Sequence, residues 1–149
     1  MNIITKDITT VEFGVIVHQV NCQGVMGSGV AKALRDKWPK IYDSYRDAEK
    51  LLGNIDVCEI KENLYVVNLF GQDEYKRGID DHWGRFTSYG AWELALPRLR
   101  DYIIRNGLPD MIYFPYNVGC DRGGGGDWRI ISAMIEEYFP NAKFCKLEG

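Results

Sequence analysis

The 149-residue chain lacks a long apolar run, a CxxC pair and an N-terminal signal pattern. Crossing a membrane takes an apolar run of roughly 18 residues, and a signal peptide begins with a charged segment followed by an apolar one. Structural zinc is not expected either, because only two histidines accompany four isolated cysteines: Cys22, Cys58, Cys120 and Cys145. These absences predict a cytoplasmic protein with free thiols, no membrane contact and no bound metal.

An excess of basic residues is also missing. The chain has 18 Lys and Arg residues against 21 Asp and Glu residues, which gives a formal net charge of −3. Proteins bind nucleic-acid backbones through basic side chains, so a nucleic acid is not expected as the main ligand. Hydrophobic residues make up 46% and charged residues 26%, as in an ordinary folded domain. No repeat or linker interrupts the chain, so residues 1–149 are predicted to form a single domain.

Short β-branched runs alternate with segments of helical period. Strands are predicted at residues 2–5, 14–20, 56–60, 64–70, 111–116 and 143–147. Helices are predicted from about Val30 to Pro39, over residues 41–52, from near Ser88 to Gly107, and from the N-cap Asp127 to Pro140. Pro97 predicts a kink or a break in the third of these helices. The alternation predicts an α/β protein with a mostly parallel sheet covered on both sides.

Glycine is the residue in excess. The chain has 16 glycines, against about 10 expected from average usage, and many fall in two loops, residues 23–29 and 117–126. Each loop follows a predicted strand and precedes a helix, which is where α/β sheets bind ligands. Glycines let successive backbone N–H groups converge on an anion, and the next helix adds its dipole. Two such loops predict a diphosphate site; the alternative is that the glycines only make tight turns.

Better-known phosphate loops do not fit the spacing. Gly24 and Gly29 satisfy GxxxxG, but the next two residues are not the Lys and Ser or Thr of a Walker loop. The glycine order in the first loop is GxxGxG rather than the GxGxxG of dinucleotide-binding proteins. Neither Cys22 nor Cys120 is followed six residues later by the arginine of a cysteine phosphatase. The loops therefore indicate a phosphate-binding protein of another type.

Three segments together resemble the macro domains, a family that binds ADP-ribose. They are residues 6–9 (KDIT), residues 18–31 (HQVNCQGVMGSGVA) and residues 115–128 (PYNVGCDRGGGGDW). The order and spacing fit over essentially the whole chain, although Lys6 replaces the usual glycine and the third segment is about one residue longer than usual. The resemblance implies a three-layer α/β/α fold with a mixed, mostly parallel sheet of about six strands. Within the family, the chain looks most similar to small stand-alone members that process ADP-ribose 1″-phosphate and related adducts.

The resemblance also implies roles for individual residues. Asp7 would accept a hydrogen bond from the adenine amino group, Ile8 would offer its N–H to the ring, and Asn21 would hold hydroxyls of the distal ribose. Apart from the resemblance, Arg122 is a candidate for pairing with a terminal phosphate, and the alternative is a solvated loop arginine. Backbone N–H groups would bind the diphosphate at Gly27, Ser28, Gly29 and Val30 of the first segment, and at Val118, Gly119, Cys120, Gly123, Gly124 and Gly125 of the second.

Two side chains are candidates for preparing a water molecule. His18 resembles a histidine proposed as the base in phosphatases of this fold, and an imidazole suits that task at neutral pH. A buried structural histidine is the alternative, because a regular strand would point His18 and Asn21 to opposite faces. Placing them together requires a bulge, or Asn21 beyond the end of the strand. Asp121 resembles the acid of macro-domain hydrolases that release ADP-ribose, and its alternative is an exposed loop carboxylate.

The combined prediction is an enzyme that needs no metal or other cofactor. It would bind ADP-ribose and hydrolyse ADP-ribose 1″-phosphate to ADP-ribose and phosphate, with Asn21 beside the catalytic His18 or Asp121. One alternative is a hydrolase that removes ADP-ribose from protein or nucleic acid, and another is a reader that binds ADP-ribose without chemistry. We expect a monomer, for which a nucleic acid is a partner only if it carries ADP-ribose.

Overall fold

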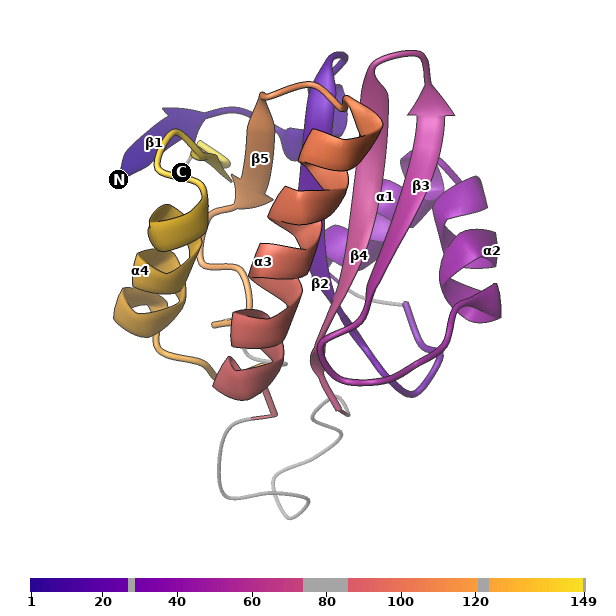
Figure 1. The fold of residues 1–149 in the computed structure, drawn as a ribbon. Helices are drawn as coiled ribbons and strands as arrows, with labels where there is room; N and C mark the ends of the chain where they lie inside the picture. Colours follow the sequence, from indigo (N-terminus) through magenta and orange to yellow (C-terminus); the bar gives the residue numbers. More distant parts are fainter. Residues whose placement is uncertain (27–28, 74–85, 121–123, 149) are drawn as a thin grey trace.

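The computed structural model describes residues 1–26, 29–73, 86–120 and 124–148 (Figure 1). Within these ranges the strands are β1 (Asn2–Thr5), β2 (Gly14–Asn21), β3 (Ile55–Lys61), β4 (Leu64–Gln72), β5 (Ile112–Pro115) and β6 (Lys143–Lys146). The helices are the short 3-10 helix η1 (Ile8–Thr10) and the α-helices α1 (Gly29–Lys37), α2 (Lys40–Asp47), α3 (Tyr89–Asn106) and α4 (Trp128–Tyr138).

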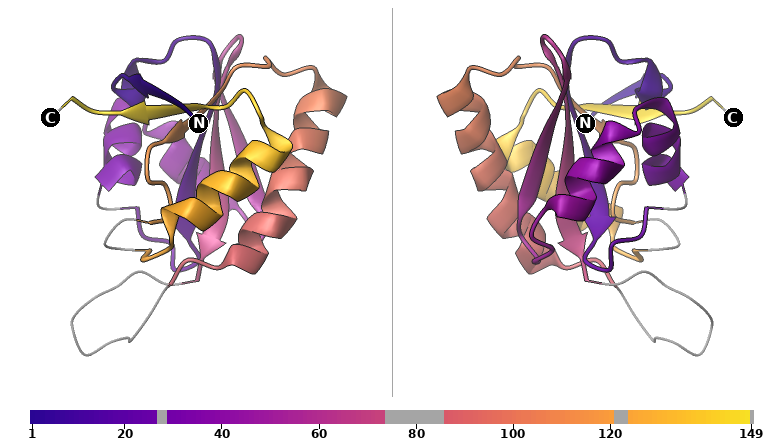
Figure 2. Two further views of the ribbon diagram at one scale, coloured as in Figure 1. Left: turned by 90° about the vertical axis from the view of Figure 1, so that its left-hand side faces the viewer. Right: turned by 90° about the vertical axis from the view of Figure 1, so that its right-hand side faces the viewer.

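The strands form one six-stranded sheet in the order β1-β6-β5-β2-β4-β3. All neighbours run parallel except β3 and β4, which form an antiparallel hairpin. Helices α3 and α4 cover one face of the sheet, and α1 and α2 cover the other (Figure 2). The prediction of a three-layer α/β/α fold with a mixed, mostly parallel sheet is confirmed.

The alternation of side chains along β2 divides the core into two halves. Val15 and Val17 pack in the half that contains α3 and α4, whereas Ile16 and Val20 pack in the half that contains α1 and α2. Successive strand residues point to opposite faces, so a central strand covered on both sides needs apolar residues at nearly every position. The polar residues at the carboxyl end of β2 therefore stand out, and each has a specific partner.

One predicted helix boundary is wrong, and one of the two alternatives predicted for Pro97, a break, is excluded. Helix α2 ends at Asp47 rather than at residue 52, because Ala48 adopts an extended backbone conformation. Helix α3 runs without a break through Pro97. Proline removes one backbone donor, but Trp92, Leu96 and Leu99 on the same helix are fully buried, and their packing offsets that loss.

The predicted helix termini are confirmed for α3 and α4. Gly107 ends α3 in the left-handed conformation, with φ of 64°, which favours glycine. Asp127 caps α4 by accepting a hydrogen bond from the backbone N–H of Arg129 at 2.9 Å. These caps fix where each helix starts or ends relative to the sheet.

Candidate functional site

Both glycine loops lie at the carboxyl edge of the sheet. The first loop (residues 23–29) follows β2 closely, and the second loop (residues 117–126) follows β5. Strand β2 pairs in parallel with β5 on one side and with β4 on the other, so all three strands end at the same edge. The edge also receives η1, which follows β1. The fold thus gathers the three segments that carry the sequence resemblance.

At the end of β2 the pairing with β4 becomes irregular, and Asn21 lies on the side of the sheet that carries His18. The register with β4 shifts between Val20 and Asn21. His18 bonds to Asn68, which donates to the backbone carbonyl of Ile41 in α2, and Asn21 bonds to Tyr45 of the same helix. The regular alternation of side chains therefore does not extend to Asn21, which lies on the α2 side together with His18.

The side chain of Asn21 holds the first loop. Its Oδ1 accepts hydrogen bonds from the backbone N–H of Gln23 at 3.0 Å, from that of Val25 at 3.4 Å and from the Tyr45 hydroxyl at 2.8 Å. Its Nδ2 donates to the carbonyl of Val25 at 2.8 Å. The amide is therefore a fixed part of the loop, and its role toward a ribose stays a prediction.

The first loop leads into the N-terminus of α1. Helix α1 begins at Gly29, whose φ of 60° is left-handed, and Val30 is partly exposed. N–H groups in the first turn of a helix have no partner within it, so Gly29 and Val30 present suitable donors for an anion. Gly27 and Ser28 lie outside the described residues.

The second loop is anchored at two carbonyl groups. The Gly119 carbonyl accepts from the backbone N–H of Gly126 at 2.9 Å and from the Thr87 hydroxyl at 2.6 Å. The Gly124 carbonyl accepts from the N–H groups of Phe86 and Thr87, at 2.9 and 3.0 Å. A Cβ on Gly124 would lie 2.7 Å from the Gly119 oxygen, so glycine is needed there for close packing.

The remaining predicted residues of the second loop divide into two groups. Val118 is buried, Cys120 is half-buried, and Gly125 is exposed in a left-handed conformation with φ of 70°. Asp121, Arg122 and Gly123 lie outside the described residues. Their proposed roles, including that of Asp121 in catalysis, stay predictions.

Gln19 of β2 supports the second loop through Thr87. This role was not predicted from the sequence. The Trp92 indole N–H donates to Gln19 Oε1 at 2.8 Å, and Gln19 Nε2 donates to the Thr87 hydroxyl at 3.0 Å and to Gln72 Oε1 at 2.9 Å. The Thr87 hydroxyl in turn donates a hydrogen bond to the Gly119 carbonyl. The sequence does contain an indication of this role, because Gln19 is a polar residue in an otherwise apolar strand and a buried polar side chain requires hydrogen-bond partners.

Asp7 caps the N-terminus of η1, and Ile8 is the first residue of η1. One carboxylate oxygen of Asp7 accepts hydrogen bonds from the backbone N–H and the hydroxyl of Thr9, at 2.9 and 2.8 Å. Both bonds hold the pKa of Asp7 below its usual value, and the bond from the backbone has the larger effect. The positive charge of Lys37 lowers this pKa further. Asp7 therefore offers an exposed, ionised acceptor, while the Ile8 side chain is buried.

His18 lies in the interior, with only 1% of its surface exposed. Its Nε2 lies 2.5 Å from Asn68 Oδ1, and its Nδ1 has no partner among the described residues. Burial lowers the pKa of His18 from 6.5 to about 4, against the opposing effect of the Asn68 hydrogen bond. The imidazole is therefore neutral at pH 7. A catalytic role would require water to reach this ring, and it stays a prediction.

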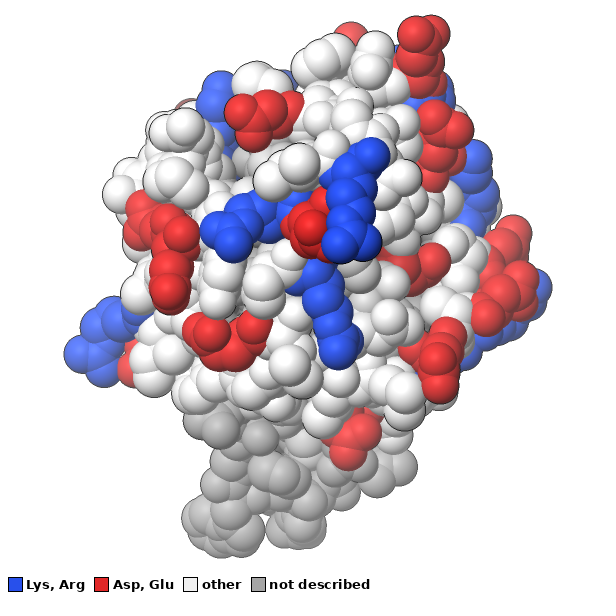
Figure 3. Space-filling view, viewed as in Figure 1, with Lys and Arg blue, Asp and Glu red and all other residues white. Residues whose placement is uncertain are grey.

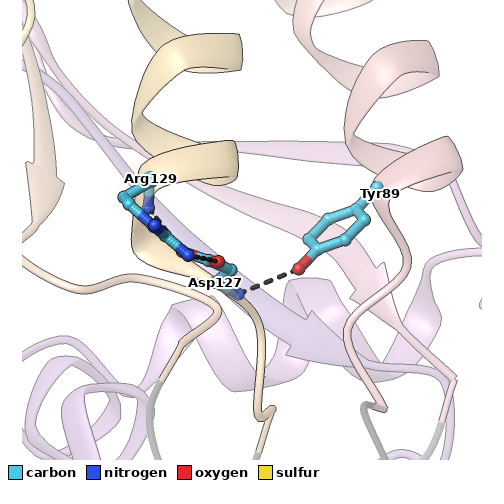
Figure 4. Close-up of polar contacts among 3 residues, drawn as sticks. All are labelled: Tyr89, Asp127 and Arg129. Carbon is cyan, nitrogen blue, oxygen red and sulfur yellow. Dashed lines mark hydrogen bonds and ion pairs between the residues drawn. The ribbon is translucent and has the colours of Figure 1, made fainter.

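Asp127 and its neighbours close the second loop (Figure 4). The Asp127 carboxylate pairs with the Arg129 guanidinium at 2.9 Å, and its backbone N–H donates to the Tyr89 hydroxyl at 2.9 Å. The hydrogen bonds from Arg129 hold the pKa of Asp127 below its usual value. Tyr89 is the first residue of α3, so this contact ties the start of α4 to the start of α3.

The remaining observations concern the cysteines, possible metal ligands and the charged surface. The four cysteines are free thiols, and burial raises the pKa of Cys22. The described residues contain no group of three or more His, Cys, Asp or Glu side chains able to hold a metal, and none of the described helices is long and apolar enough to cross a membrane. On the face that carries α3 and α4, acidic and basic side chains are interspersed (Figure 3).

No protein-family model matches the chain. Two curated proteins named DNA ADP-ribosyl glycohydrolase, from Mycobacterium bovis (strain BCG / Pasteur 1173P2) and Mycobacterium tuberculosis (strain ATCC 25618 / H37Rv), are each 25% identical to it over 137 residues. The matches cover 89% of this chain, and the chain spans only 37% of the length of either relative.

Solved structures share the fold over nearly the whole chain. A Bacteroides thetaiotaomicron protein of unknown function has a TM-score of 0.82 at 23% identity, covering 97% of both chains. A macrodomain protein from Streptomyces coelicolor has a TM-score of 0.77 at 19% identity, covering 99% of both. Thermosipho africanus DarTG, solved in complex with ADP-ribose, has a TM-score of 0.78 at 18% identity, covering 99% of this chain and 42% of the other. With the sheet order and loops described above, these likenesses show that the chain has the macrodomain fold.

Proposed function

We propose that the chain binds ADP-ribose at the carboxyl edge of its sheet and hydrolyses a bond at the distal ribose. The observation that carries the proposal is the convergence of both glycine loops and η1 at that edge. Exposed, ionised Asp7 would accept from the adenine amino group, and Ile8 would donate its backbone N–H to the ring. Asn21 would donate to a hydroxyl of the distal ribose.

The diphosphate would lie between the two loops. The first turn of α1 supplies the N–H groups of Gly29 and Val30, and we propose that Gly27 and Ser28 add theirs. From the other loop, Val118, Gly119 and Cys120 would contribute, together with the glycines Gly123, Gly124 and Gly125. Backbone donors of this kind suit phosphate oxygens because they need no rearrangement on binding.

We propose DNA-linked ADP-ribose as the first substrate to test. The similarity to two curated DNA ADP-ribosyl glycohydrolases supports it. In this reaction water adds to the anomeric carbon of the distal ribose, the bond to DNA breaks, and the DNA leaves with a proton. Asp121 is the candidate carboxylate for orienting that water.

ADP-ribose 1″-phosphate is the second substrate, and basic side chains beside the first loop favour it. Arg35 donates to the carbonyl of Met26 at 3.4 Å, and the Lys50 side chain lies beside Gly24. Two cations near the loop would stabilise the additional charge of a phosphomonoester. Water would then attack phosphorus, releasing phosphate and ADP-ribose, with Arg122 pairing with the phosphoryl group.

A binding and turnover experiment tests the proposal. Calorimetry with ADP-ribose should show saturable binding, and the protein should release ADP-ribose from modified single-stranded DNA or from the 1″-phosphate. Asn21→Ala should weaken both activities, whereas the control Asp36→Ala, on the exposed surface of α1, should leave them unchanged. Binding without turnover of either substrate would leave only a reader. Absence of ADP-ribose binding would refute the proposal.

A further inference from the structure

Tyr45 connects α2 to the first loop. The side chain is fully buried, and its ring stacks on Phe70 of β4 with centroids 5.6 Å apart. Its hydroxyl lies 2.7 Å from the Asn21 carbonyl oxygen and 2.8 Å from Asn21 Oδ1. The same hydroxyl accepts a hydrogen bond from the backbone N–H of Gly24 at 3.0 Å. One side chain of the α2 layer therefore holds two residues at the carboxyl end of β2.

The single hydroxyl proton determines the direction of these bonds. A tyrosine hydroxyl has one proton to donate, and Gly24 N–H is already a donor, so the proton must go to the two oxygens of Asn21. Burial raises the pKa of Tyr45 to about 12, against the hydrogen bonds that lower it, so the hydroxyl keeps its proton at neutral pH. The Tyr45 hydroxyl is therefore a hydrogen-bond donor to Asn21.

This contact in turn fixes which way the Asn21 amide points. Oδ1 accepts from Tyr45 and from the N–H groups of Gln23 and Val25, so it must be the oxygen. Nδ2 donates one of its two protons to the Val25 carbonyl. If the Asn21 amide were flipped, its NH2 group would face the N–H groups of Gln23 and Val25 and the Tyr45 hydroxyl, which are themselves donors. Asn21 can therefore offer a ligand only a donor, through the second proton of Nδ2.

Helix α2 is itself held in position by a chain of polar contacts. Ser44 donates to the Asp56 carboxylate at 2.8 and 2.9 Å, and Asn68 Nδ2 donates to the same carboxylate at 3.0 Å and to the Ile41 carbonyl at 3.2 Å. Asn68 Oδ1 faces His18 Nε2. These contacts fix the turn of α2 that carries Tyr45 against β2, β3 and β4.

We propose that Tyr45 is a positioning residue for the ligand site: its hydroxyl orients the Asn21 amide and fixes Gly24 so that the first loop is preformed. The proposal rests on the proposed function, since it concerns ADP-ribose binding at the same edge. The ligand group that Asn21 meets must then be an acceptor, such as a ribose hydroxyl oxygen. Preforming the loop in the free protein removes the cost of ordering it when the ligand binds.

The test uses Tyr45→Phe, which keeps the ring that stacks on Phe70. The matched control is Tyr42→Phe, one turn earlier on α2, where the ring rather than the hydroxyl packs against the Arg35 guanidinium at 4.2 Å. ADP-ribose affinity is measured by calorimetry, and adenosine affinity by NMR titration, because adenosine reports on the adenine contacts alone. Amide hydrogen exchange of Gly24 is measured without ligand.

Tyr45→Phe should weaken ADP-ribose binding about tenfold, the effect of losing one hydrogen bond of ordinary strength, and leave adenosine affinity unchanged. Gly24 exchange should become faster. Tyr42→Phe should behave as wild type in all three measurements. Equal losses for ADP-ribose and adenosine, or wild-type ADP-ribose affinity in Tyr45→Phe, would overturn the proposal. If the wild type binds no ADP-ribose, the proposed function fails, and unchanged Gly24 exchange would separately refute the contact that fixes the loop.

Discussion

Acidification should destabilise the protein through His18. Asn68 Nδ2 donates to the Ile41 carbonyl and to Asp56, so Asn68 Oδ1 must accept the proton of His18 Nε2. The neutral ring therefore carries its proton on Nε2, and a second proton would have to go to Nδ1. Nδ1 is buried and has no partner among the described residues. Protonation would thus bury both a charge and an unpaired donor.

The sign and size of the effect follow from linkage. Burial lowers the pKa of His18 in the folded protein, so the unfolded chain binds the proton more readily as pH falls. The contribution of neutral His18 to the free energy of unfolding is fully present above pH 6.5, the pKa of histidine in the unfolded chain. It is lost as the pH falls toward about 4, the pKa of His18 in the folded protein. Between pH 7 and pH 5 the loss is about 2 kcal/mol. At about 2–4 °C per kcal/mol, the unfolding midpoint should fall by about 4–8 °C.

The assay compares thermal unfolding of the wild type and His18→Gln from pH 7 to pH 5. Glutamine can still donate to Asn68 Oδ1 but does not titrate. The other histidine, His82, is present in both proteins, so its contribution cancels in the difference. The midpoint of the wild type should fall more steeply than that of the variant, and parallel curves would refute the reasoning. Retained turnover by the variant would assign His18 to the core alone.

Further substitutions test the close packing of the second loop and the adenine contacts. Gly124→Ala should destabilise the protein by about 1–3 kcal/mol, because its Cβ would overlap the Gly119 oxygen; unchanged denaturant unfolding would contradict this. Gly90→Ala in α3 is the control, because an added Cβ there would lie 3.8 Å from Ser88 Oγ, an ordinary van der Waals distance. This substitution should stabilise the helix by up to about 1 kcal/mol. Asp7→Asn keeps an oxygen for capping η1 but loses the charge, so adenosine binding should weaken several-fold in an NMR titration while the unfolding midpoint stays unchanged.

The elements of the fold were predictable because their signals are local. The near-continuous apolar run in β2 requires cover on both faces, and Gly107 and Asp127 have the residue types that end and begin helices. The residue types were less informative where tertiary contacts decide the outcome. Pro97 lies within α3 because fully buried side chains on both sides of it hold the helix against the sheet. Helix α2 ends at Asp47, where Ala48 adopts an extended conformation, although no proline or glycine stands there to indicate it.

The location of the site was predictable for a different reason. Parallel strands end at a common edge, so loops after β2 and β5 must come together once the sheet is parallel. The partners that hold those loops were not predictable, because they are distant in sequence. Tyr45 contacts Asn21 across 24 positions, and Trp92 contacts Gln19 across 73. Periodicity indicates which face a residue occupies but not which hydroxyl or indole lies opposite.

Three polar residues at the carboxyl end of β2 have separate partners. His18 faces α2 and bonds to Asn68, whereas Gln19 faces α3 and supports the second loop through Thr87. A regular strand would also turn Asn21 toward α3, where Gln19 already occupies the polar partners. At the point where the register with β4 shifts, Asn21 instead lies on the α2 side and bonds to Tyr45. Each loop is therefore held from a different face of the same strand, so a change to one support should alter one loop and spare the other.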